Sequence, residues 1–183
     1  GITIKKNKKN ADVTAVEISE KAVGYINKNI KHNNIEMNVL VINCGSSSLK
    51  FQLINSDTEA VLAKGLCERI GIDGKLTHTS TGKEKIQKDI PMPTHAQAVA
   101  ALVKSLTDKE HGCISDMAEI SAVGHRIVHG GPWLIKSVRV DDQVIADLEK
   151  CRDLAPLHTV PHLLGIRGCM EVMPSTPQVL VID

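Results

Sequence analysis

A short polar block between two apolar, β-branched segments is the part of the sequence best suited to chemistry. The block reads Asn43-Cys44-Gly45-Ser46-Ser47-Ser48-Leu49-Lys50 and lies between the apolar residues 39–42 and 51–54. Gly45 lets the backbone approach a ligand closely, the serines and exposed amides donate hydrogen bonds, and Lys50 adds a positive charge. These groups suit a polyanion such as a phosphate. A hairpin with a serine-rich turn is the alternative interpretation.

A second candidate is the run Val123-Gly124-His125-Arg126-Ile127-Val128-His129-Gly130-Gly131, in which an arginine and two histidines flank a strand pattern that ends in paired glycines. The guanidinium of Arg126 can bind a carboxylate or a phosphate through two parallel hydrogen bonds. The alternative is a surface ion pair beside two core histidines, and the sequence leaves both interpretations open.

Two single residues complete the set of candidates. His158 ends the run Asp153-Leu154-Ala155-Pro156-Leu157-His158, where the pattern alone favours a capping or core histidine. Asp183 follows the apolar strand pattern 178–182. Ligands of open α/β sheets bind outside the carboxyl ends of the strands, so a carboxylate here could organise Mg²⁺. A terminal residue without function is the alternative.

The elements that must position these residues alternate between strand and helix patterns from residue 37 onward, which predicts an α/β fold. Thr94 and Gln97 form a capping box ahead of apolar residues at helical spacing, Asp142 is expected to cap a second helix, and Pro161 is expected to begin a third. We expect strand edges or loop over residues 75–93. The predicted strands are 39–42, 51–54, 61–66, 122–128 and 178–182.

Composition excludes several classes of function. The 183 residues hold 22 basic and 21 acidic side chains, a balance that does not indicate a nucleic acid or membrane surface as partner. No apolar run approaches the roughly 20 residues of a membrane span, and the N-terminus lacks a secretory signal pattern. The five cysteines are far apart and include no CxxC pair. Reduced thiols and a cytoplasmic location are therefore expected.

Residues 1–36 differ in charge from the remainder, with seven lysines against four acidic residues. A strand pattern over 12–18 and a helix pattern after Ser19 predict a strand–helix appendage. This pattern resembles a fragment of an S-adenosylmethionine-dependent methyltransferase, in which Glu17 would hold ribose hydroxyls. The glycine-rich loop of that family is absent, so methyl transfer is not expected. Met37 reads as an initiator methionine, and we expect residues 1–36 to be a foreign remnant.

From residue 37 onward the sequence resembles acetate kinase. The segments that carry the resemblance, in the family's order and spacing, are 39–54, 65–72, 122–131, 154–158, 163–166 and 179–183. The resemblance implies a ribonuclease-H-like lobe of the acetate and sugar kinase/actin-like fold, with residues 37–183 as the N-terminal lobe. It also implies the reaction ATP + acetate = ADP + acetyl phosphate with Mg²⁺, homodimers for complete members, and little or no activity for this fragment alone.

The resemblance further implies a role for each matching residue. Asn43 would help hold Mg²⁺, and phosphate would be contacted by Lys50, Ser46 and Ser48. Arg126 would bind the substrate carboxylate, and the methyl pocket would be lined by Val128 and Leu157. Asp183 would be the active-site acid/base, and His158 would lie near the site. Because acetate is already deprotonated near neutral pH, we expect Asp183 to position Mg²⁺ or its water shell rather than remove a proton.

The sequence departs from the family at one point and leaves two questions open. The family usually reads HNP-x-N where this chain reads His158-Thr159-Val160-Pro161-His162, which puts the local conformation around His158 in doubt. Propionate and butyrate kinases share much of the pattern, so the acyl chain length stays open. A non-catalytic anion-binding module is the alternative function.

Overall fold

The structure is a computed structural model that describes residues 37–182. The strand expected over 12–18, the helix expected after Ser19, and Asp183 lie outside the described residues.

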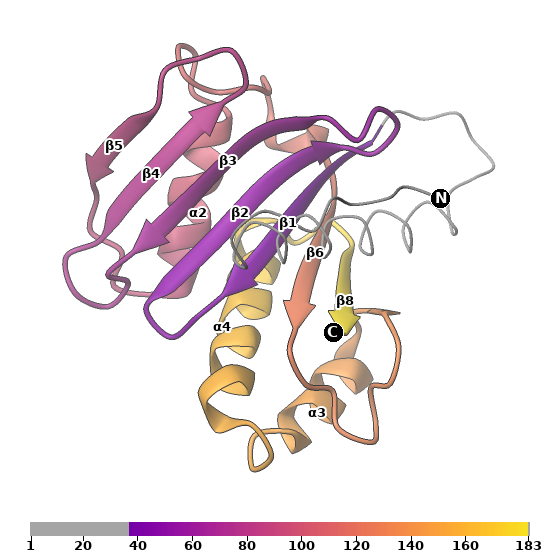
Figure 1. The fold of residues 1–183 in the computed structure, drawn as a ribbon. Helices are drawn as coiled ribbons and strands as arrows, with labels where there is room; N and C mark the ends of the chain where they lie inside the picture. Colours follow the sequence, from indigo (N-terminus) through magenta and orange to yellow (C-terminus); the bar gives the residue numbers. More distant parts are fainter. Residues whose placement is uncertain (1–36, 183) are drawn as a thin grey trace, which may run out of the picture.

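The described residues form an eight-stranded mixed sheet in the order β5-β4-β3-β2-β1-β6-β8-β7. Figure 1 shows this sheet with helices α2 and α4 behind it. The strands are β1 (Asn38–Cys44), β2 (Ser48–Asn55), β3 (Val61–Glu68), β4 (Lys75–Ser80), β5 (Ile86–Asp89), β6 (Ile120–Ile127), β7 (Val138–Arg139) and β8 (Gln178–Ile182). The helices are α2 (His95–Leu106), the 3₁₀ helix η1 (Met117–Glu119), α3 (Asp142–Lys150) and α4 (Pro156–Val172). The α/β fold class predicted from the sequence is confirmed.

The sheet changes from antiparallel to parallel at β1, and this change sets the position of the site. Strands β1 to β5 form an antiparallel meander, whereas β1, β6 and β8 are parallel neighbours. Parallel strands need long crossovers, which here contain α2 between β5 and β6, and α3 and α4 between β6 and β8. The carboxyl ends of β1, β6 and β8 therefore meet at one edge of the sheet, the lower edge in Figure 1.

The two faces of the sheet carry different side chains because neighbouring residues of a strand point to opposite sides. On the face covered by α2 and α4, Leu40 and Ile42 of β1 join the main apolar core with Leu102 of α2. On the opposite face, Val39 and Val41 belong to a second buried apolar cluster that includes residues of β6 and β8. Continuing β1 by two residues from Val41 brings Asn43 onto this second face.

Two helix starts differ from the sequence predictions. The side chain of Asp141, not Asp142, caps α3, by accepting a hydrogen bond of 2.8 Å from the backbone N–H of Val144. Helix α4 begins at Pro156, five residues before the predicted start at Pro161. Pro156 occupies the first helical position, where the missing N–H has no intrahelical partner in any case, so it is the better start signal. Pro161 lies inside the helix and removes one of its backbone hydrogen bonds.

The other predicted elements are confirmed, with bounds that differ from the prediction by a few residues for most strands, while β8 has the predicted bounds. The capping box of Thr94 and Gln97 is present at the start of α2. The polar segment 75–93 forms β4 and β5 together with connecting loops. Among the described helices, none combines the length and the apolar character that crossing a membrane would need.

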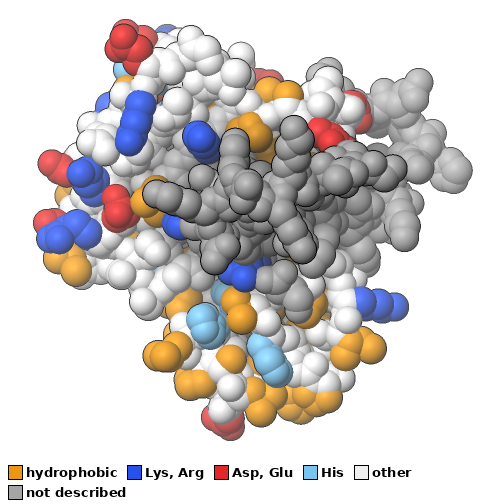
Figure 2. All heavy atoms as spheres, in the orientation of Figure 1, with side chains coloured by type: hydrophobic (Ala, Val, Ile, Leu, Met, Phe, Trp, Pro, Cys, Tyr) orange, Lys and Arg blue, Asp and Glu red, His pale blue; other side chains and the backbone are white. Residues whose placement is uncertain are grey.

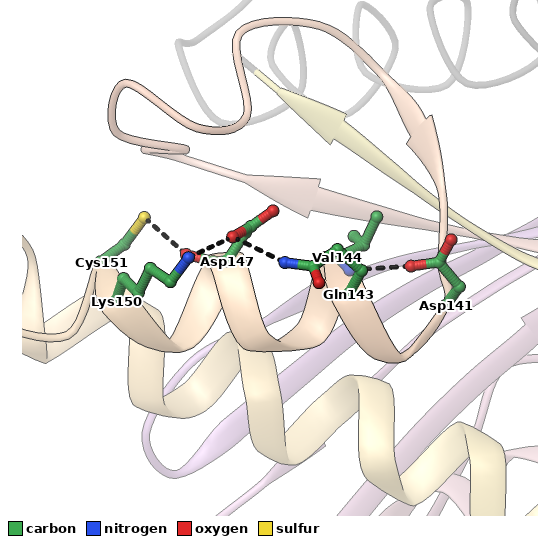
Figure 3. A network of polar contacts seen from close by, with 6 residues as sticks. All are labelled: Asp141, Gln143, Val144, Asp147, Lys150 and Cys151. Carbon is green, nitrogen blue, oxygen red and sulfur yellow. Dashed lines mark hydrogen bonds and ion pairs between the residues drawn. The ribbon is translucent and has the colours of Figure 1, made fainter.

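Helix α3 is held by polar contacts along its exposed side (Figure 3). Asp147 accepts hydrogen bonds from Lys150 at 2.6 Å and from Gln143 at 3.2 Å. The ammonium of Lys150 also lies 5.7 Å from the ring centroid of Trp133 in the loop after β6. These contacts fix the segment that leads from β6 towards α4.

Candidate anion-binding site

The polar block predicted from the sequence forms the β1–β2 turn. Asn43 and Lys50 are direct cross-strand partners, so their side chains lie on the same face of the sheet. The backbone N–H of Gly45 donates to the carbonyl of Ser48 at 2.8 Å and closes the turn. A Cβ added at Gly45 would lie 3.0 Å from the hydroxyl oxygen of Ser48, so a larger residue here would require the Ser48 side chain to shift. Ser46 and Lys50 are exposed, and Ser48 is half-buried.

Arg126 lies on the same face of the sheet as Asn43. The last β1–β6 pair is Ile42 with His125, so the next residues along the two parallel strands are Asn43 and Arg126. On its other side, Arg126 is the register partner of Val181 in β8. Arg126 is half-buried. The structure therefore places an amide and a guanidinium at the carboxyl ends of β1 and β6, with the ammonium of Lys50 beside them at the start of β2. Sheets of this kind bind ligands at the carboxyl ends of their parallel strands.

His158 lies at the start of α4, close to the same edge of the sheet. It is exposed and stacks on His162, one helical turn further, with ring centroids 6.3 Å apart. Burial, together with smaller contributions from repulsion by His158, His125 and Arg126, lowers the pKa of His162 to about 4. Arg126 thus lies within electrostatic range of His162.

The histidines behind the site are neutral at pH 7. His125 is buried, and burial lowers its pKa to about 4, while its Nε2–H donates to the side-chain oxygen of Gln178 at 2.6 Å. His162 is also buried, and its Nδ1 has no hydrogen-bond partner among the described residues. These two histidines therefore add no positive charge to this edge, and among residues 37–182 side chains such as Lys50 and Arg126 supply it.

The two residues expected to line an apolar pocket lie near this edge but on different elements. Val128 follows β6 directly and is half-buried. Leu157 is the second residue of α4, and 83% of its surface is exposed. Figure 2 shows apolar side chains gathered on the lower part of the molecule, with histidine side chains among them. Exposed apolar residues of this region include Trp133, Ile135, Leu154, Leu157, Val160 and Leu164.

Oxygen-rich donors make this edge compatible with Mg²⁺. Among residues 37–182 no group of three or more His, Cys, Asp or Glu side chains could hold a metal ion. Mg²⁺ needs no such cage, because it keeps several waters and takes most remaining ligands from substrate phosphates. The amide oxygen of Asn43 and the hydroxyls of the turn are hard donors of the required kind.

One residue near the turn was not singled out from the sequence. His95, the first residue of α2, is buried, and its Nε2–H donates to the carbonyl of Gly45 at 2.9 Å. The only local sequence signal for this contact was a histidine beside the capping residue Thr94. The two residues joined by the hydrogen bond are 50 positions apart in the sequence, so no local pattern links them.

The cysteine beside the turn is not a nucleophile. Burial raises the pKa of the Cys44 thiol to about 12, and Cys44 lies against α4, where a Cβ at Gly165 would approach its sulfur to 2.9 Å. Its role is to pack β1 against the helix. All five cysteines of the chain are free thiols.

Known proteins are similar to this chain in sequence and in fold. The chain is 55% identical to acetate kinase of Agathobacter rectalis over 147 residues, which cover 80% of this chain and 37% of that protein. It is 54% identical to acetate kinase of Clostridium botulinum (strain Loch Maree / Type A3), again over 80% of this chain and 37% of that protein. The chain thus spans little more than a third of the length of these relatives.

Solved structures give the same result. The crystal structure of Porphyromonas gingivalis acetate kinase matches with a TM-score of 0.78 and 41% identity, over 80% of this chain and 37% of that one. A propionate kinase from Francisella tularensis matches with a TM-score of 0.72 and 37% identity, over the same shares.

The family match begins where the described fold begins. The acetokinase family matches residues 38–183, which include the turn, the Arg126 strand and the residue after β8. The resemblance of residues 1–36 to a methyltransferase fragment gains no support from these relatives. The fold expected from the resemblance to acetate kinase is confirmed, and the chain belongs to the acetokinase family.

Proposed function

We propose that this chain is the N-terminal lobe of an acetate kinase and contributes the phosphate-facing half of a site that moves the γ-phosphoryl group of ATP to acetate. The observation that supports this most directly is the joint position of Asn43, Lys50 and Arg126 on one face at the carboxyl ends of β1 and β6. Residues 1–36 are proposed to be a separate appendage to this lobe.

The charges of the site fit the demands of this reaction. Both reactants are anions, so the main task is to bring a carboxylate oxygen in line with the phosphorus while offsetting their repulsion. Lys50 would contact phosphate oxygens together with Ser46 and Ser48. Arg126 would bind the carboxylate through two hydrogen bonds, which its planar guanidinium favours.

Magnesium and the apolar pocket complete the proposal. Asn43 would help hold Mg²⁺, and Asp183 would place the ion or its water shell. Bound Mg²⁺ neutralises charge that develops on the phosphate oxygens. In a complete relative, an Asp183→Asn change that kept magnesium affinity yet abolished turnover would contradict this role. Val128 and Leu157 would line the pocket for the methyl group, with His158 beside it.

Acetate is favoured over longer acids by the overall match, since the two relatives named above that are 54–55% identical are both acetate kinases. A cytoplasmic location is proposed on the basis of the five free thiols.

Ligand binding by the 183-residue chain tests the site directly. Lys50→Ala should weaken binding of Mg-ATP about tenfold, the usual cost of one hydrogen bond to a charged group, and Arg126→Ala should weaken binding of acetyl phosphate by a similar factor. Both affinities should fall as salt is added. Isothermal titration measures them.

The matched control is Lys109→Ala, which removes an exposed lysine on the loop after α2, outside the β1–β2 turn. This variant should bind both ligands as the unchanged chain does. Equal affinities for Lys50→Ala, Arg126→Ala and the control would refute the proposed site. Binding without turnover in a longer chain that includes the rest of the family's length would favour the anion-binding module.

A further inference from the structure

Three carbonyl groups of the β1–β2 turn accept hydrogen bonds from the protein. The carbonyl of Ser48 accepts from the N–H of Gly45 at 2.8 Å, and the carbonyl of Ser47 accepts from the N–H of Ile70 at 3.0 Å. The carbonyl of Gly45 accepts from Nε2 of His95 at 2.9 Å. Of these three hydrogen bonds, only the one to the Gly45 carbonyl comes from a side chain. A substitution at His95 can therefore remove this hydrogen bond without changing the backbone.

The direction of the Gly45 carbonyl decides the direction of the next N–H. The C=O and N–H groups of a trans peptide lie in one plane and point in opposite directions, and the described residues contain no cis peptide. Since the Gly45 carbonyl points towards His95 beneath the turn, the N–H of Ser46 points away from His95. Ser46 is exposed. This N–H is therefore turned outwards at the position proposed for phosphate.

The imidazole that holds this carbonyl is itself held firmly. His95 is 6% exposed and is the first residue of α2, whose start is fixed by the Thr94 capping box. Helix α4 packs against the same point, because a Cβ at Gly168 would lie 3.1 Å from the backbone of Ala96. A carbonyl oxygen only accepts, so Nε2 of His95 must carry the proton.

We propose that His95 is a positioning residue of the phosphate loop, and that its hydrogen bond to the Gly45 carbonyl turns the N–H of Ser46 outwards to donate to a bound phosphate. This inference rests on the proposed function of the turn and names a residue through which that function is achieved. His95 does not touch the ligand. It fixes the turn before the ligand arrives, so that binding needs no reorientation of the peptide.

Two amide substitutions that differ only in reach test the inference. In His95→Gln the side-chain amide can still extend to the Gly45 carbonyl, whereas in His95→Asn it is one methylene shorter. The probe is inorganic phosphate, titrated into the 183-residue chain while the backbone amide shifts of Gly45, Ser46 and Ser47 are followed by NMR. His95→Asn should weaken binding about tenfold, the value of one hydrogen bond, and His95→Gln should stay within about threefold of the unchanged chain.

The matched control is His78→Asn. His78 is fully buried in β4 and bonds Ser80 and His111 rather than the turn, so its loss should lower the melting temperature and leave phosphate binding unchanged. Equal phosphate affinity in His95→Asn and the unchanged chain would overturn the inference. Equal weakening in His78→Asn would do so as well, because general destabilisation would then be the cause.

A measurement without ligand separates this inference from the proposed function. Long-range ¹H–¹⁵N spectra should show His95 protonated at Nε2, and a proton on Nδ1 alone would overturn the inference. If the unchanged chain shows the expected tautomer yet binds no phosphate at up to about 100 mM, roughly a hundredfold above the weakest affinities usually tabulated, the phosphate loop is refuted, and the role of His95 with it. Phosphate binding that His95→Asn does not weaken would refute the role of His95 alone.

Discussion

At the scale of single residues, buried histidines should make the fold sensitive to acid. The pKa of His125 and that of His162 are lowered to about 4, mainly by burial, while in the unfolded chain both are near the ordinary value of 6.5. Below pH 6.5 the unfolded chain therefore binds protons that the folded chain does not. Stability is full above pH 6.5 and is lost as the pH falls towards 4.

We expect the free energy of unfolding to fall by about 2 kcal/mol for each of these two histidines between pH 7.5 and pH 5. His162→Leu removes one titrating group along with its unpartnered Nδ1, so about half of this loss should disappear. Urea unfolding at the two pH values measures the effect. His129→Gln, a change of an exposed histidine, is the control and should keep the full pH dependence. An unchanged pH dependence in His162→Leu would contradict the prediction.

Part of the site could be predicted from residue types in the sequence. The remaining contacts join residues that are far apart along the chain, so the sequence pattern did not predict them. Asn43 and Lys50 could be paired from the sequence because a short turn between two strand patterns brings their side chains together. Arg126 could be assigned to a strand end, but its place beside β1 depends on a crossover that contains β2 to β5 and α2. The hydrogen bond of His95 depends on the same packing, and no local pattern encodes it.

At the scale of secondary-structure elements, α4 shows where apolar periodicity is insufficient. The apolar residues Leu163, Leu164, Ile166 and Met170 recur along this helix. In the structure Leu163 is 1% exposed, whereas Leu164 is 42% exposed. The helix packs on β1, β6, α2 and α3 by one side and leaves apolar residues on the other. An apolar spacing marks which residues prefer burial, but the sheet and neighbouring helices decide which residues obtain it.

This difference predicts opposite outcomes for two adjacent leucines. Leu163→Ala should lower the free energy of unfolding by about 2–5 kcal/mol, because it leaves a cavity in the cluster with Ile127 and Leu148. Leu164→Ala should cost less than about 1 kcal/mol, since little buried surface is lost. Chemical denaturation of both variants gives the comparison, with each serving as the other's control. Equal losses would mean that α4 packs by a different side.

At the scale of the whole molecule, the residues of this chain form one side of the proposed site. Asn43, Lys50 and Arg126 lie at the edge of a single sheet, and Leu157, a proposed pocket residue, is 83% exposed. The chain spans 37% of the length of its acetate kinase relatives. In-line phosphoryl transfer needs groups that hold the two reacting oxygens from both sides and exclude water.

The chain of 183 residues should therefore bind phosphate compounds and yet catalyse little transfer. We expect acetyl phosphate formation from ATP and acetate, measured as the hydroxamate, to be at least about 10³-fold slower than for the complete Agathobacter rectalis acetate kinase, since losing even one aligned donor costs about 10²–10³ in kcat. Intact Mg-ATP binding in the same preparation shows that the lobe is folded and its half of the site is formed. Turnover within about tenfold of the complete enzyme would refute a divided site, because single residues that position a substrate already exceed that factor.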